Sequence, residues 1–204
     1  MKSLEVSVLI VGGGGAGLTA SMLLSRLGVD SLLVSALPTT SVLPKAHVLN
    51  QRAMEILTDA GVAGEIYARS TPAANMSHSA FYIGLAGDDP AYGRQVARLE
   101  CWGAGRADLD WAAASRCRQA NLPQIRLEPI LKAGAERLAP GRIRFHTELV
   151  DFTQDDDGVT ATVLDKTSGE TTEVRSRFLL ACDGGRTVGP RLGVRLEGVR
   201  DLFR

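Results

Sequence analysis

The sequence contains no long hydrophobic segment and no excess of either charge. The apolar stretch nearest the N-terminus, residues 6–11, is shorter than the ~7–15 residues of a signal-peptide core and far shorter than the ~18 of a membrane-spanning helix. Lysine and arginine together number 23, as do aspartate and glutamate, so no basic surface is indicated that would attract nucleic acid. We therefore expect neither a membrane nor a nucleic acid as a partner.

Cysteine and histidine are also scarce. The three cysteines form no C-x-x-C or zinc-binding pattern, and the three histidines have no metal-ligand spacing. No G-x-S-x-G segment is present to carry the nucleophile of a hydrolase. These absences predict a cytoplasmic protein without a metal site. The 204 residues suffice for one domain, or for one domain and part of another.

Glycine, in contrast, is concentrated near the N-terminus, in the sequence VLIVGGGGAGL. The apolar residues predict a buried strand, and Gly12, Gly14 and Gly17 form the G-x-G-x-x-G pattern that joins such a strand to a helix in dinucleotide-binding proteins. The first glycine allows a tight turn, the second lets a pyrophosphate approach the backbone, and the third lets the helix pack close to the strand. Gly15 and Ala16 lie within this pattern and are further candidate contacts, and the N–H groups at the start of the helix would face the phosphates. These residues predict a dinucleotide site; the alternative is a glycine-rich turn before a buried helix.

The pattern after this turn predicts an α/β fold. Helical spacing follows over residues 16–27, and a short apolar run at 31–35 predicts a second buried strand, which completes a βαβ unit. A further helix is expected over residues 50–60, capped by Asn50 and ended by Gly61.

The rest of the chain departs from this alternation. Residues from about 72 to 112 are irregular and read as an excursion from the core sheet, with short strands near 81–83 and 96–102. A helix is predicted over residues 129–138. Turn signals then separate three alternating segments, which predict an antiparallel meander over 143–152, 159–165 and 172–177. A last apolar run at 178–182 predicts a buried strand. Because a hydride-transferring Rossmann domain would keep alternating strands and helices, the meander favours a flavin-binding variant.

Four segments together resemble the flavoprotein aromatic hydroxylases, the FAD monooxygenases that include phenol hydroxylase and para-hydroxybenzoate hydroxylase. They are the glycine turn, PKAHVLNQRAMEIL at 44–57, NLPQIRLEPIL at 121–131 and LACDGGRTV at 180–188. The similarity points especially to the branch of dichlorophenol monooxygenase and the polyketide hydroxylases. It implies a Rossmann-like FAD-binding domain of the para-hydroxybenzoate hydroxylase type over residues 1–204, with a β-meander. It also implies an incomplete substrate domain, toward which residues 72–112 would extend.

The resemblance also implies roles for individual residues. Asp183 and Gly184 occupy the family's Asp-Gly motif, which lies near the FAD pyrophosphate and is implicated in NAD(P)H binding. Gln124 matches the glutamine that reaches the flavin side of the cofactor. Lys45 stands where the family often has an arginine near the cofactor, and Arg52 is another candidate contact. The alternatives are a strand-ending turn at Asp183 and ordinary solvent-exposed side chains at the other three positions.

Two positions depart from the family pattern. Most dinucleotide sites carry an acidic residue at the end of the second strand, where this chain has Ser35, whose hydroxyl would bind ribose more weakly. The family's Gly-Asp motif, which binds the ribityl chain and the flavin ring, follows the Asp-Gly motif, but the chain ends at Arg204 without it. The Gly87-Asp88 pair precedes the Asp-Gly motif and is read as an ordinary turn. We therefore expect the sequence to be the N-terminal portion of a longer enzyme.

The leading functional hypothesis is the FAD-binding part of a monooxygenase that hydroxylates phenolic or polyketide aromatic substrates. In that family NAD(P)H reduces the flavin and molecular oxygen supplies the inserted atom. One alternative is a non-catalytic nucleotide-binding fragment that needs a partner or the missing C-terminal part, and another is a flavin- or NAD-dependent reductase of the same superfold. The sequence identifies no catalytic base. Because a sheet cut from its packing partner exposes apolar area, a homo-oligomer is also expected as a possible state.

Overall fold

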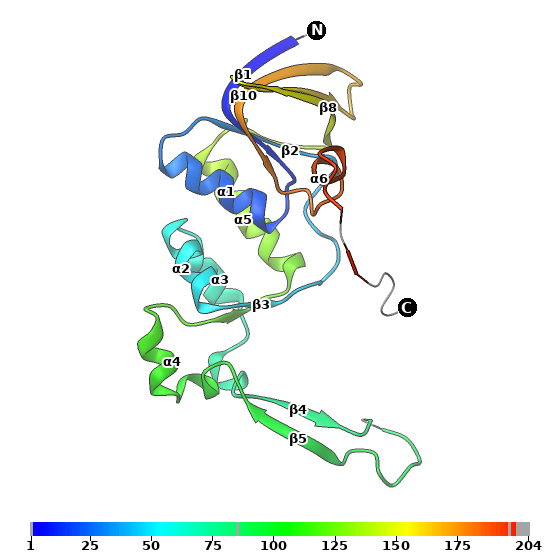
Figure 1. Cartoon of the computed structure of the whole chain (residues 1–204). Helices are drawn as coiled ribbons and strands as arrows, with labels where there is room; N and C mark the ends of the chain where they lie inside the picture. Colours follow the sequence, from blue (N-terminus) through cyan, green and yellow to red (C-terminus); the bar gives the residue numbers. More distant parts are fainter. Residues whose placement is uncertain (1, 85, 196, 199–204) are drawn as a thin grey trace. The chain divides into compact units, whose positions relative to one another are not determined.

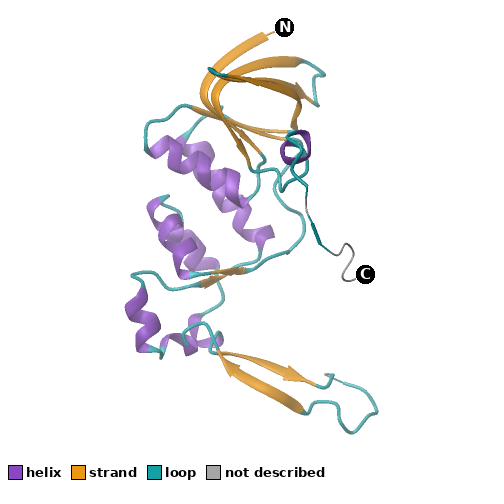
Figure 2. Ribbon diagram, in the orientation of Figure 1, coloured by secondary structure: helices purple, strands orange, loops and turns teal. Residues whose placement is uncertain are grey.

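The computed structural model describes residues 2–84, 86–195 and 197–198 and divides into two compact units (Figure 1). The first, here called the sheet unit, comprises Met1–Leu43 and Ile125–Arg204, and the second, here called the middle unit, comprises Pro44–Gln124. Helices and strands occur in both units (Figure 2), and the predicted α/β class is confirmed. No described helix is both long and apolar enough to cross a membrane.

The sheet unit is built on one six-stranded mixed sheet with the strand order β7-β2-β1-β10-β9-β8. The first four strands in this order are parallel to their neighbours, whereas β9 and β8 continue the sheet in antiparallel fashion. Their bounds are β1 Lys2–Val11, β2 Ser31–Ser35, β7 Ile143–Phe145, β8 Thr147–Asp155, β9 Gly158–Asp165 and β10 Thr171–Ala181. The antiparallel run β8-β9-β10 is the predicted meander.

Apolar side chains on both faces explain why the central strands read as continuous hydrophobic runs. Leu9 of β1 and Leu32 of β2 belong to a buried cluster with Val163 and Val174 of the meander. Ile10 is equally buried but points to the opposite face, because side chains alternate along a strand. Helix α1 (Gly15–Arg26) packs on β1 and β2, and α5 (Gln124–Leu138) runs beside it (Figure 1).

The βαβ prediction is confirmed to within a residue or two at most ends. The strand predicted at 31–35 is β2, and the helix predicted at 16–27 is α1, shifted by one residue. Gly28 follows it with φ +72°, a backbone conformation that favours glycine. Strand β1 begins at Lys2 rather than at residue 6, because its polar first half pairs with β10, an interaction that local hydrophobicity does not reveal.

The two strands predicted at 172–177 and 178–182 are in fact one strand, β10. Its first half is paired on both sides, with β9 and with β1, whereas residues 178–181 pair only with β1 among the described strands. The prediction that this second half is buried was wrong, since Phe178 is 56% exposed and Leu180 is 37% exposed. The second half of β10 has the apolar composition of a fully buried strand, but among the described residues only β1 pairs with it, along one edge.

Two other boundaries were misplaced. Helix α5 begins at Gln124, five residues before the predicted start, with Pro129 inside it. Proline favours the first position of a helix, but here it only removes one N–H donor from the second turn. The strand predicted at 143–152 is split at His146, whose φ is +55° and whose N–H donates to the Leu37 carbonyl. The chain there leaves β7, which pairs with β2, and enters β8, which pairs with β9.

The middle unit contains short helices and two small antiparallel pairs of strands. Helix α2 (Gln51–Asp59) confirms the prediction: the Asn50 side chain caps it by accepting from the Ala53 N–H at 2.8 Å, and Gly61 follows with φ +81°. The remaining elements are β3 Val48–Leu49, α3 Ala63–Arg69, η1 Ala73–Asn75, β4 His78–Tyr82, β5 Gln95–Glu100, η2 Ala104–Arg106, α4 Leu109–Ala114 and β6 Ala120–Asn121. β3 pairs with β6, and β4 pairs with β5 as a hairpin. The two hairpin strands overlap in sequence with the short strands expected near 81–83 and 96–102.

Candidate functional site

At Gly12 and Gly17, the two outer glycines of the pattern, neighbouring backbone leaves no room for a side chain in the turn between β1 and α1. Gly12 has φ +116°, its N–H donates to the Val34 carbonyl at 2.8 Å, and an added Cβ would overlap the Cys182 carbonyl. An added Cβ on Gly17 would overlap the Gly12 carbonyl oxygen. Glycine at these positions is therefore required by the turn and by the close packing of α1, as the pattern predicted.

Gly13 carries a constraint that the sequence did not reveal. A Cβ at this position would lie 2.7 Å from the Phe145 ring and 2.9 Å from the Ser35 Cβ. Ser35 ends β2, and Phe145 ends β7, which lies beyond β2 in the sheet. The requirement for glycine at position 13 therefore depends on the order of the strands. In the G-x-G-x-x-G pattern this position is unspecified, and only the extra glycine itself hinted at it.

Gly14 and Gly15 are different, because the described neighbours leave room for a side chain at both positions. A Cβ on Gly14 would lie 3.5 Å from Oε1 of Glu128, and one on Gly15 would lie 4.0 Å from the Leu131 side chain, both ordinary contact distances. Gly14 is the N-cap of α1 and supplies no side-chain cap, and the first turn contains no acidic residue. The exposed Ala16 follows. This end of α1 has the bare backbone and N–H groups that a pyrophosphate could approach.

The Asp-Gly turn lies next to the glycine turn. β1 and β10 are parallel neighbours, Val11 is opposite Ala181, and the Cys182 N–H donates to the Val11 carbonyl at 2.8 Å. The ends of the two strands therefore bring Asp183 close to Gly12: a Cβ on Gly12 would lie 2.8 Å from the Asp183 nitrogen. Gly184 follows with φ +70°.

The Asp183 carboxylate organises its own turn. Oδ2 accepts from the N–H groups of Thr187 and Val188 at 2.6 and 2.9 Å, and Oδ1 accepts from that of Gly185 at 3.0 Å. Burial alone would raise the pKa of this carboxyl, but the backbone hydrogen bonds outweigh burial and hold the pKa below its ordinary value. Asp183 thus holds the connection from β10 to the short helix α6 (Val188–Arg191), and its contact with a cofactor stays a prediction.

Ser35 ends β2 as predicted and is buried, at 6% exposure. The acidic residue usual at this position is absent, and Asp30 at the start of the strand is ion-paired with Arg142 instead. The residues predicted in the sheet unit, from Gly12 to Gly17 with Ser35, Asp183 and Gly184, therefore gather at the carboxyl ends of its adjacent parallel strands, where ligands bind in open α/β sheets.

In the middle unit, the backbone brings Lys45 and Gln124 together. Lys45 has φ +43°, which is uncommon for a residue with a side chain. The carbonyls of its two neighbours, Pro44 and Ala46, both accept from the Gln124 N–H at 2.9 Å. The two residues that the resemblance assigned to the cofactor are thus adjacent, and their contact with the cofactor stays a prediction.

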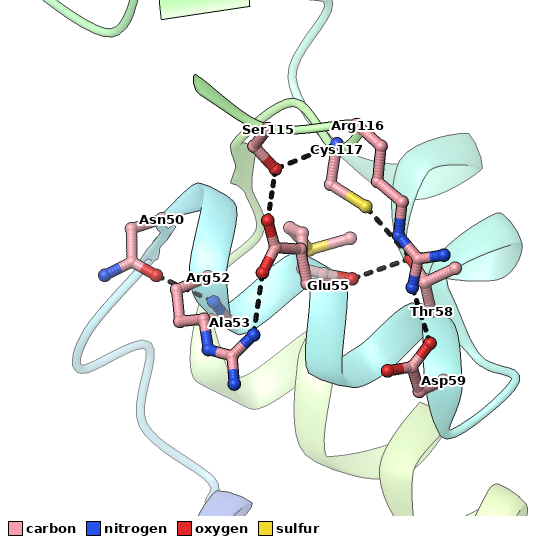
Figure 3. A network of polar contacts seen from close by, with 10 residues as sticks. Asn50, Arg52, Ala53, Glu55, Thr58, Asp59, Ser115, Arg116 and Cys117 are labelled. Carbon is pink, nitrogen blue, oxygen red and sulfur yellow. Dashed lines mark hydrogen bonds and ion pairs between the residues drawn. The ribbon is translucent and has the colours of Figure 1, made fainter. Parts of the chain in front are cut away.

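Arg52 lies on the first turns of α2, where its guanidinium pairs with Glu55 at 2.8 Å (Figure 3). The other oxygen of Glu55 accepts from the Ser115 hydroxyl at 2.6 Å. The hydrogen bonds from Ser115 and from Arg52, in this order of strength, hold the pKa of Glu55 below its ordinary value. Arg116 pairs with Asp59 on the same helix at 2.6 Å. This network fastens residues 115–117 to α2, and Arg52 already has a partner in it, so its predicted contact with a cofactor stays a prediction.

Sequence reasoning assigned no role to Glu128. It is a carboxylate with 2% exposure on the buried side of α5, and Oε2 accepts from the Ser41 N–H at 2.6 Å. The available signal was its position between the apolar residues Leu127 and Ile130, where a charged side chain is rarely buried without a purpose. Among the described residues, no group of His, Cys, Asp and Glu is arranged to hold a metal.

Comparisons with known proteins agree with this geometry. Residues 5–204 match the FAD binding domain family. A 2,4-dichlorophenol 6-monooxygenase of Delftia acidovorans is 37% identical over 197 residues, which are 96% of this chain and 32% of the relative. Tetracenomycin B2 monooxygenase-dioxygenase of Streptomyces olivaceus is 38% identical over 212 residues, covering 97% of this chain and 38% of the relative.

A solved structure extends the likeness to three dimensions. The crystal structure of the flavin-dependent monooxygenase PieE, in complex with FAD and substrate, superposes with a TM-score of 0.89 at 40% sequence identity. The alignment covers 99% of this chain and 34% of that one. The chain therefore spans about a third of the length of these proteins.

Proposed function

Because this chain belongs to the family of FAD-binding domains, we propose that it is the cofactor-binding part of a flavin-dependent monooxygenase. The proposed enzyme hydroxylates phenolic or polyketide aromatic substrates with NAD(P)H as reductant and molecular oxygen as co-substrate. Support for the substrate class comes from relatives named as a dichlorophenol monooxygenase and a tetracenomycin monooxygenase-dioxygenase. The main evidence for the cofactor is the backbone at Gly14, which has room beside it, whereas at Gly12 and Gly17 the space for a side chain is filled by other backbone atoms.

The residues of the sheet unit fit the ADP end of FAD. The first turn of α1 offers N–H groups to the pyrophosphate without a competing acidic side chain in that turn. The Ser35 hydroxyl would face the ribose, and the turn at Asp183 and Gly184 would border the phosphates. Lys45, Arg52 and Gln124 are proposed as further cofactor contacts from the middle unit. When bound, FAD supplies the redox chemistry, while the chain binds and orients it.

The cofactor proposal is tested by comparing three ligands. Flavin fluorescence is followed while the purified protein is titrated with FAD, then with FMN, and ADP is added as a competitor. Since the described glycine turn accounts for the ADP half, FAD should bind saturably, ADP should displace it, and FMN should bind much more weakly. Equal affinity for FAD and FMN, or no binding of FAD, would contradict the proposal.

The catalytic part of the proposal needs a second measurement. Oxygen uptake by the FAD-loaded protein is recorded with NADH or NADPH, with and without a phenol. Stimulation by the phenol together with formation of a hydroxylated product is the expected result. If FAD binds but no phenol stimulates oxygen uptake, the chain by itself is limited to cofactor binding, which is the non-catalytic alternative.

We also propose a cytoplasmic location and self-association. The first is supported by three cysteines that are all free: Cys101, Cys117 and Cys182. The second is supported by exposed apolar side chains on the second half of β10, at Phe178 and Leu180. Light scattering after size exclusion measures the mass, and a monomer at all concentrations would contradict self-association.

A further inference from the structure

The Glu128 carboxylate occupies an unusual place for a charged group. It is 2% exposed and lies on the side of α5 that also buries Leu127, Ile130 and Leu131. Burying a carboxylate is costly unless hydrogen bonds compensate for lost hydration. One such bond is the short contact from the Ser41 N–H to Oε2 at 2.6 Å; bonds to a charged acceptor are shorter than bonds between neutral groups.

The same carboxylate reaches the glycine turn. Its Oε1 atom lies 3.5 Å from the position that a Gly14 Cβ would occupy. Glu128 therefore accepts a hydrogen bond from the loop after β2, at Ser41, and lies beside the residue that precedes the first turn of α1. These two segments of the sheet unit are far apart in sequence. The Ser41 loop is compact, since the Ser41 hydroxyl both donates to the Leu43 carbonyl and accepts from its N–H.

We propose that Glu128 is a positioning residue of the cofactor site. It ties the Ser41 loop to α5 beside Gly14 and so sets the shape of the open backbone face before the cofactor binds. This inference rests on the proposed function. A carboxylate would repel a pyrophosphate that it touched, so Glu128 acts through the backbone segments that it holds and does not contact the phosphates.

The test uses two substitutions at Glu128 and one control. Glu128→Met keeps the volume and removes both acceptors, and replacing a buried charge by an apolar side chain of similar size is often tolerated by the fold. Glu128→Gln keeps one acceptor for the Ser41 N–H and removes the charge. Glu136→Met is the matched control, because Glu136 lies on the same helix but is exposed and paired with Lys132.

Four quantities are measured on each protein: the Kd for ADP, the Kd for FAD, and, by NMR, the hydrogen exchange rate and the chemical shift of the Ser41 amide. In Glu128→Met we expect faster exchange at Ser41 and a Kd about tenfold higher for both ligands, as the loss of a charged hydrogen bond implies. Glu128→Gln should recover most of the affinity, and Glu136→Met should match the wild type. If Glu128 only stabilised the fold, the loss of ligand affinity would instead follow the free energy of unfolding. In that case the affinity of Glu128→Gln would not recover in step with the protection of its Ser41 amide.

The outcomes are separable. Unchanged ligand affinity in Glu128→Met, or a loss for FAD without a loss for ADP, would overturn the positioning role while leaving the proposed function intact. Failure of the wild type to bind either ligand would overturn the proposed function itself. If Glu128→Met does not fold, Glu128→Gln decides: affinity near that of the wild type with a protected Ser41 amide supports the proposal, and weak binding with that amide still protected contradicts it.

Discussion

The glycine turn of the sheet unit and the Lys45–Arg52 segment of the middle unit both supply residues predicted to bind the cofactor, but they are held in different ways. In the glycine turn, the absence of side chains is the functional feature, and contacts with the backbone of Val34 and Cys182 hold Gly12 in place. In the middle unit, the predicted residues carry long charged or polar side chains, and Arg52 is mostly exposed. A substitution in the glycine turn should therefore destabilise the fold or strongly weaken binding, whereas a substitution in the Lys45–Arg52 segment should change the affinity only moderately.

The largest effect is expected from Gly17→Ala. The added Cβ would overlap the Gly12 carbonyl oxygen and approach the Cys182 side chain, so α1 could not keep its place against β1. We expect the free energy of unfolding to fall by about 3 kcal/mol or more, measured by urea denaturation. Gly64→Ala is the control, because Gly64 lies in α3 and no other described side chain comes within 4 Å of its Cβ position. Equal stability of the two variants would mean that the turn is not closed by its own packing.

The next largest effect should come from Gly14→Ala, which should weaken ligand binding and leave stability nearly unchanged. The protein has room for this Cβ, 3.5 Å from Glu128, so the free energy of unfolding should change by less than about 1 kcal/mol. The methyl group would occupy the approach of the pyrophosphate, and we expect the Kd for FAD and ADP to rise by about a hundredfold. A variant that binds both ligands normally would show that the open face at Gly14 is not the phosphate site.

Asp183→Asn tests the turn beside the glycine turn. Asparagine offers one acceptor oxygen in place of two, so at least one of the three N–H donors at Gly185, Thr187 and Val188 loses its partner. We expect a loss of about 2 kcal/mol in the free energy of unfolding at neutral pH. Asp156→Asn, in the exposed β8–β9 turn, is the control and should cost less than about 0.5 kcal/mol.

The pH dependence of the same variant has a definite sign. The folded-state pKa of Asp183 lies below the value of 3.8 of the unfolded carboxyl, so its contribution to stability is complete above pH 3.8 and is lost as the pH falls through the folded-state pKa. Denaturation curves between pH 6 and pH 2 should show a steeper loss of stability for the wild type than for Asp183→Asn. Parallel curves would contradict the role of the carboxylate.

The smallest effect is expected from Arg52→Ala in the middle unit. The ion pair with Glu55 is exposed on the arginine side, and such pairs contribute less than about 1 kcal/mol. Glu55→Gln breaks the same pair but keeps the guanidinium. If Arg52 contacts FAD, Arg52→Ala should raise the Kd a few-fold while Glu55→Gln leaves it unchanged. Equal effects of both variants would assign Arg52 to the network around α2 alone.

Local patterns predicted both units well where structure depends on neighbouring residues. The strand at 31–35, the helix after the glycine turn and the Asn50 cap were correct because apolar periodicity and capping act within a few residues. The start of α5 was wrong because the preference of Pro129 for a helix start was outweighed in the folded chain. The burial of residues 178–181 was wrong because hydrophobicity records what a strand can bury, while exposure depends on which neighbours are present.

The candidate site shows the same division. The sequence by itself determined that Gly12, Gly14 and Gly17 stand at a strand-to-helix turn, since the spacing of residues without side chains sets where the backbone can bend and be approached. Only the tertiary structure decided which of these glycines the protein needs for itself and which it leaves open. It also decided that Gly13 is closed by Phe145 and that Glu128 holds Ser41, 87 residues away. Such contacts depend on strand order and helix packing, which no local pattern encodes.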